Sequence, residues 1–184
     1  MARTLKKALL GVGVVSVLGV AMMPLTTIAT TTQNVEITAT IDSTLTLSVN
    51  NSVVNLGVLT PGGAPSTGQT TANVVTNNHT GYNLSIRSLT AATAMAAGGG
   101  REIPALGTPG ALNAVATQSA WGYRIGAAVN FTGVTATDVQ INTLNTTTTA
   151  LGHDTLITFG AFARDGQAAG NYSATVVLTA VANV

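Results

Sequence analysis

The chain has 184 residues, of which only 7% are charged, with a formal net charge of +1 and no cysteine. The sparse charge leaves no basic patch for nucleic acid, which is bound through clustered Lys and Arg side chains. The lack of cysteine excludes disulfides and a cysteine-linked lipid anchor, so a hydrophobic core alone has to stabilise the fold.

The first 29 residues differ from the rest of the chain. A positively charged segment at residues 3–7 precedes an uncharged, mostly apolar stretch at 8–23, and Thr27 and Ala29 place small residues at −3 and −1 of a cleavage site. This layout is typical of a secretory signal peptide. We therefore expect 1–29 to be a signal helix and the protein to be secreted or held at the cell surface. The alternative is an uncleaved anchor, although 16 residues fall short of the roughly 20 that span a bilayer.

The remaining segment, residues 30–184, has the size of a single domain. It keeps four arginines against six carboxylates, a net charge of −2. No charge run suggests binding to a membrane surface. Any membrane contact is therefore expected only through an uncleaved N-terminal segment.

Period-two alternation of apolar and polar residues dominates this domain and predicts strands rather than helices. Turn signals such as residues 60–63 and 77–81 separate the alternating stretches. About nine strands of this kind predict an all-β fold, an antiparallel β-sandwich with half-buried sheets. The predicted strands cover residues 35–41, 45–49, 54–58, 69–77, 82–86, 121–125, 139–141, 156–162 and 172–180.

Residues 91–118 interrupt the alternation. They are rich in Ala and Gly and include the run Gly98-Gly99-Gly100. We expect a long loop here, with one helical turn at 91–97. Loops of this length in a compact domain are often functional or mobile, and a solvated excursion without a task is the other interpretation.

Three stretches together resemble bacterial surface domains of the fimbrial-subunit and spore coat protein U type. They are residues 54–62, an apolar-Gly turn into a Pro-Gly loop; residues 76–86; and residues 169–179, which contain Gly-Asn-Tyr-Ser-Ala-Thr-Val. The resemblance implies an immunoglobulin-like, pilin-like sandwich whose last strand lies in the third stretch. Proteins of this type commonly carry a disulfide, and this chain departs from them in having none.

The N-terminal strand is open to two interpretations. Its apolar residues Val35, Ile37, Ala39 and Ile41 alternate with polar ones. Subunits that join by strand exchange offer a separable strand of this kind to a neighbour. Residues 30–41 are therefore either such a donor strand or the first strand of the protein's own sandwich.

The sequence offers little catalytic chemistry. His79 lies in a turn, and His153 precedes Asp154, so on a strand these two side chains would point to opposite faces. Neither a Gly-x-Ser-x-Gly elbow nor a His-x-x-x-His metal spacing occurs. We therefore expect a protein that is not an enzyme, with no catalytic residue, metal or cofactor.

Trp121 and Tyr123 are two residues apart and so share one face of a strand. They are either a core pair or a stacking platform for sugar rings. The leading hypothesis is an exported structural protein, a subunit of a surface layer, coat or filament whose partners are its own copies or other envelope proteins. The alternative is a monomeric adhesive module that binds polysaccharide through Trp121 and Tyr123.

Overall fold

The computed structural model describes residues 31–184, so the expected signal helix at 1–29 lies outside the described residues. Residues 40–184 form one compact unit, and residues 31–39 belong to a separate one. Within 31–184 no helix is long and apolar enough to cross a membrane.

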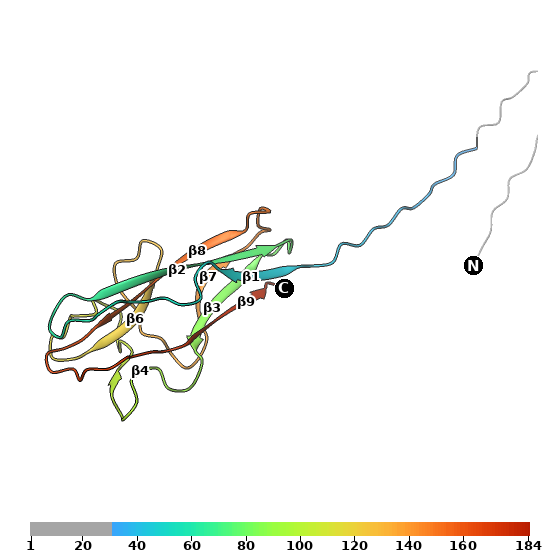
Figure 1. Ribbon diagram of the computed structural model, residues 1–184. Coiled ribbons are helices and arrows are strands. Elements are labelled where there is room, and N and C mark those ends of the chain that lie inside the picture. Colours follow the sequence, from blue (N-terminus) through green and yellow to red (C-terminus); the bar gives the residue numbers. More distant parts are fainter. Residues whose placement is uncertain (1–30) are drawn as a thin grey trace, which may run out of the picture. The chain divides into compact units, whose positions relative to one another are not determined.

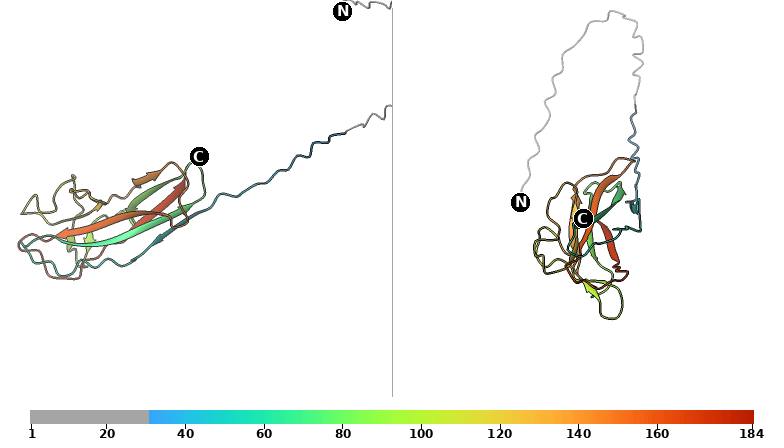
Figure 2. Two further views of the ribbon diagram at one scale, coloured as in Figure 1. Left: turned by 90° about the horizontal axis from the view of Figure 1, so that it is seen from above. Right: turned by 60° about the vertical axis from the view of Figure 1, so that its left-hand side comes forward.

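The compact unit is all-β, and its sheets are antiparallel, as the alternation predicts (Figures 1 and 2). One sheet has the strand order β1-β2-β8-β6, the second has the order β7-β3-β9, and a separate hairpin pairs β4 with β5. The strands are β1 (Leu45–Val49), β2 (Ser66–Thr76), β3 (Tyr82–Ser88), β4 (Met95–Ala96), β5 (Glu102–Ile103), β6 (Ala120–Ile125), β7 (Val139–Leu144), β8 (His153–Phe162) and β9 (Val176–Ala182).

One hydrophobic core joins the four-stranded and the three-stranded sheet. Val74 on β2 and Ile157 on β8 contribute from the first sheet, and Tyr82 and Leu84 on β3 contribute from the second. All four side chains are fully buried. The two sheets therefore pack face to face, and each fully buried aliphatic side chain of this core contributes roughly 1.5–3 kcal/mol.

The strand predicted at residues 54–58 does not form, although Val54 and Leu56 do pack against the core. The Asn55 side-chain oxygen accepts the N–H of Gly57 at 2.7 Å, and Gly57 has a φ of 73°. This local Asx turn competes with ladder pairing and ends the extended conformation. The apolar alternation correctly indicated that Val54 and Leu56 face the core. It did not indicate that Asn55 and Gly57, within the same stretch, form a turn.

The helical turn predicted at residues 91–97 is also wrong. The chain forms β4 there, and β4 pairs with β5 across a tip made of Gly98, Gly99 and Gly100. All three glycines have positive φ, between 61° and 73°. Such a left-handed run cannot continue a right-handed helix, and it reverses the chain into a hairpin instead.

Candidate functional site: an open groove between two edge strands

The two sheets are not hydrogen-bonded to each other along the side formed by β1 and β9, although these two strands lie close together. Within the described residues, β1 pairs only with β2 and β9 only with β3, so each has one edge without a backbone partner. Core-packed side chains on the central strands are fully buried, whereas those on these two edge strands are only half-buried. The half-buried ones are Leu45, Leu47, Val176, Leu178 and Ala180.

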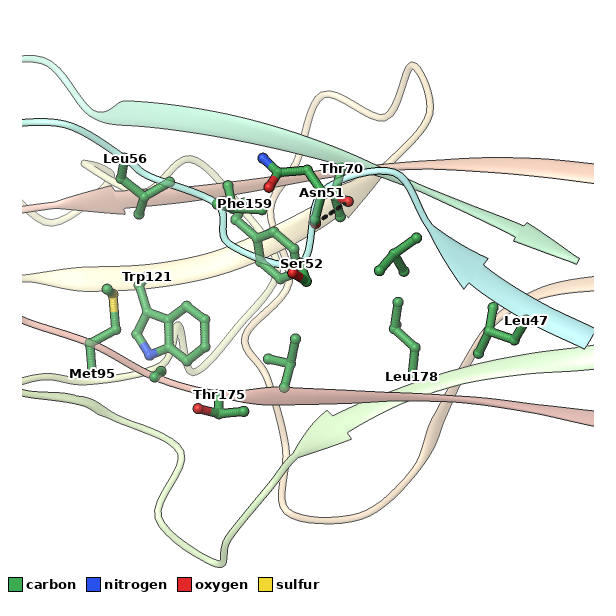
Figure 3. A pocket seen from close by; sticks show the side chains of 14 residues that line it. Leu47, Asn51, Ser52, Leu56, Thr70, Met95, Trp121, Phe159, Thr175 and Leu178 are labelled. Atoms are coloured by element: carbon green, nitrogen blue, oxygen red, sulfur yellow. Dashed lines mark hydrogen bonds between the residues drawn. The ribbon is translucent and has the colours of Figure 1, made fainter.

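An apolar groove of about 460 Å³ follows this open side, between β1 with the segment after it and β9 (Figure 3). Leu47 and Leu178 lie toward one end of the groove, and Trp121 and Met95 lie at the other end. None of its lining side chains carries a charge. The residues that line the groove are Leu47, Val49, Asn51, Ser52, Val54, Leu56, Thr70, Met95, Trp121, Phe159, Ala174, Thr175, Val176 and Leu178.

The upper wall of the groove is set by two asparagines that end β1. The backbone N–H of Asn50 still donates to the carbonyl of Thr71 at 3.1 Å, while the N–H of Thr71 donates to the side-chain oxygen of Asn50 at 2.8 Å. The hydroxyl of Thr70 donates to the carbonyl of Asn51 at 2.7 Å. After these bonds the chain no longer pairs with β2 as a strand, although Val54 and Leu56 still lie against β2 at Gly68, and the hydroxyl of Ser66 donates to the carbonyl of Leu56.

The β4–β5 hairpin limits the groove at its tryptophan end. Trp121 donates its indole N–H to the carbonyl of Thr93 at 2.9 Å, and this bond holds the ring beside Met95 of β4. Ala96 and Ser173 exchange two backbone hydrogen bonds, of 2.9 and 3.1 Å. The hairpin is thereby fixed to the segment that leads into β9, so this end of the groove is built from two distant parts of the chain.

Trp121 and Tyr123 both face the core, and each is only 4% exposed. They do share one face of β6, as their spacing predicts. Burial raises the pKa of the Tyr123 hydroxyl. Neither ring presents a face to solvent on which a sugar could stack, and Trp121 contributes instead to the lining of the groove.

The apolar side chains of the N-terminal segment, residues 35–41, are exposed, unlike Trp121 and Tyr123. Val35, Ile37 and Ile41 are 81–89% exposed, and Ala39 is exposed as well. Residues 31–44 form no strand. Residues 35–41 therefore do not pair as a first strand of the protein's own sandwich in this structure. Their apolar side chains are left exposed to solvent.

The histidines and carboxylates do not converge. The ring Nδ1 of His153 lies 2.8 Å from the hydroxyl of Tyr82, whose pKa is raised by burial. Asp154 points the other way, where Asn73 donates to it at 2.7 Å. His79 is exposed in its turn. Among residues 31–184 no three His, Cys, Asp or Glu side chains cluster around a common point.

No family model, curated protein or solved structure matches this chain. The function therefore has to be inferred from the groove and the N-terminal segment themselves. The groove has no signal in the sequence, because alternation shows which side chains face a core and not which strands remain at an edge. Met95, inside the predicted loop, is the clearest groove residue that sequence reasoning missed.

Proposed function

We propose that this protein is an exported structural subunit of a surface layer, coat or filament, and that copies join by strand addition. Residues 35–41 of one copy would enter the groove of the next. The observation that carries the proposal is the half-buried apolar face of β1 and β9, which lies open where a further strand would complete the core. Strand addition at an exposed sheet edge is a common mode of protein recognition.

The N-terminal segment fits this groove in length and in pattern. Residues 35–41 and β9 each contain seven residues, and Val176 and Leu178 of β9 line the groove. Alternation would direct four apolar side chains to one face. Those side chains are Val35, Ile37, Ala39 and Ile41.

The charges are also compatible with this fit. The other face of the inserted strand would carry Glu36, Thr38 and Thr40, which would point outward to solvent. The groove is uncharged, so burial of the apolar face would bring no charged group out of water. The backbone N–H and C=O groups of the inserted strand would pair with one of the two free edges, that of β1 or that of β9.

Such a contact is heterologous, because the donor segment and the groove are different surfaces of the chain. Repeated head-to-tail, it produces an open chain unless the rotation between copies closes a ring. This agrees with the resemblance to fimbrial-subunit and spore coat protein U domains and with an immunoglobulin-like sandwich that lacks one strand. The signal peptide expected at residues 1–29 would deliver the subunits to the surface.

The alternative, a monomeric carbohydrate-binding module, is less well supported. Trp121 and Tyr123 are buried, and a stacking platform needs an exposed aromatic face. Polysaccharide binding through these two residues would require the β6 side of the core to open. In the second class of partner, a cell-envelope protein other than this chain would donate a strand to the same groove.

Negative-stain electron microscopy of the chain, expressed with its own leader and purified after export, tests the proposal. We expect filaments or sheets with a regular repeat at rising protein concentration. A variant that lacks residues 31–41 should yield single particles with the same strand content by circular dichroism. Single particles from the unaltered chain at every concentration would count against the proposal, as would regular assemblies that form without 31–41.

A further inference from the structure

A chain that carries both a donor strand and a groove faces a competing reaction, because it can fill its own groove. Only residues 42–44 separate Ile41 from the first residue of β1, Leu45. Hairpin loops of two to five residues are common. A reversal within 42–44 would lay 35–41 antiparallel to β1 on its groove side, and the subunit would become a closed monomer.

Three hydrogen bonds from the end of β2 hold the linker, residues 42–44, in place. The side-chain amide of Asn77 binds the linker at both ends: it accepts the N–H of Thr44 at 2.7 Å and donates to the carbonyl of Asp42 at 2.8 Å. The hydroxyl of Thr76 adds a third bond, to the carbonyl of Thr44, at 2.7 Å.

The two bonds from the Asn77 amide to Asp42 and Thr44 have the pattern of backbone bonds in a β ladder. In an extended chain, residues two apart direct their backbone N–H and C=O groups to the same side, so one amide group can bind both. Asn77 directly follows β2, and β2 already pairs Thr76 with Leu45. The side chain of Asn77 therefore extends the β1–β2 ladder beyond the last backbone pair and holds 42–44 in the conformation that a hairpin turn has to abandon.

We propose that Asn77 is a positioning residue that keeps the linker extended, so that the donor strand enters a second copy of the chain rather than its own groove. This inference rests on the proposed strand exchange and adds how the choice between self-closure and assembly is made. Loss of the two Asn77 bonds should favour self-closed monomers by about tenfold or more, the factor expected from two net hydrogen bonds.

The test compares the exported chain with Asn77→Ala, and with Asn73→Ala as a matched control. Asn73 lies on β2, and its amide also makes two bonds, to the Leu151 carbonyl and to Asp154, but it does not touch the linker. Size-exclusion chromatography with light scattering gives the monomer fraction. A protease specific for Glu then reports whether the Glu36–Ile37 bond in that fraction is covered; Glu102, exposed on β5, is an internal standard for cleavage.

We expect Asn77→Ala to raise the ratio of monomer to assembled chain about tenfold or more and to protect the bond after Glu36, while Asn73→Ala assembles like the unaltered chain. A second variant that keeps Asn77, Asp42→Asn with Ser43→Gly, places an Asn-Gly turn in the linker and should act in the same direction. Equal assembly of all four proteins would overturn the inference, as would Asn77→Ala monomers cleaved freely after Glu36. Failure of the unaltered chain to assemble would instead count against the proposed function.

Discussion

Replacement of Ile37 by alanine separates the stability of a subunit from the stability of its assembly. Ile37 is 89% exposed, so in an isolated subunit its truncation should change the free energy of unfolding by no more than about 0.5 kcal/mol. If the side chain is buried in the groove of a neighbour, the same truncation costs about 2–5 kcal/mol per contact. Each 1.4 kcal/mol, approximately, changes a dissociation constant tenfold, so the dissociation constant of each contact should rise roughly 30- to 4,000-fold.

Light scattering across a concentration series measures the assembly, and thermal unfolding of dilute monomer measures the subunit. Leu151→Ala is the matched control, because Leu151 is 87% exposed and lies outside residues 35–41. It should leave both quantities unchanged. Assembly of Ile37→Ala at the same concentration as the unaltered chain would refute the reasoning, since an apolar side chain of this size cannot be buried at a contact without contributing to it.

Three further predictions concern the sandwich itself. Leu178→Ala at the groove should destabilise the monomer by about 1 kcal/mol, and Leu84→Ala, with a fully buried side chain, by about 2–5 kcal/mol; urea unfolding measures both. Gly81→Ala should cost about 3 kcal/mol or more in the same assay, because Gly81 has a φ of 80° and a methyl group there would overlap a backbone carbonyl of β7. Burial raises the pKa of Tyr82 and of Tyr123, so the unfolded state releases protons above pH 10 that the native state retains. The contribution of these two tyrosines to stability should therefore be lost as the pH rises above about 10, as denaturant unfolding at several alkaline pH values can check.

The alternating pattern predicted most of the sheet strands, because burial of one face imposes period two on the sequence. Long alternating runs such as 82–86 and 156–162 lie within β3 and β8. Residues 35–41 form no strand, and the other failures are at residues 54–58, where a side-chain amide competes for backbone hydrogen bonds, and at 91–97, where three glycines reverse the chain. The last two are local effects that an apolar pattern does not report.

The candidate site was much harder to predict than the fold. The alternating segment 35–41 could be named from Val35 and Ile37, but its role stayed undecided because a donor strand and a first strand share one pattern. The groove depends on which strands lie at the edges of the two sheets. The alternation of apolar and polar residues does not predict the order of strands in a sheet. The aromatic pair of Trp121 and Tyr123 shows the same limit, since spacing placed both on one face without showing that this face is buried.

The central claim, that the groove accepts residues 35–41 of another copy, is tested most directly by titration of a peptide of residues 33–43 into the chain that lacks 31–41. Trp121 is the only tryptophan and lines the groove, so its fluorescence reports occupancy. We expect a saturable change in emission with a rise in the melting temperature, and neither change with a scrambled peptide of the same composition. Emission that stays constant with the peptide but changes with cell-wall polysaccharide would contradict strand addition and favour the carbohydrate-binding alternative.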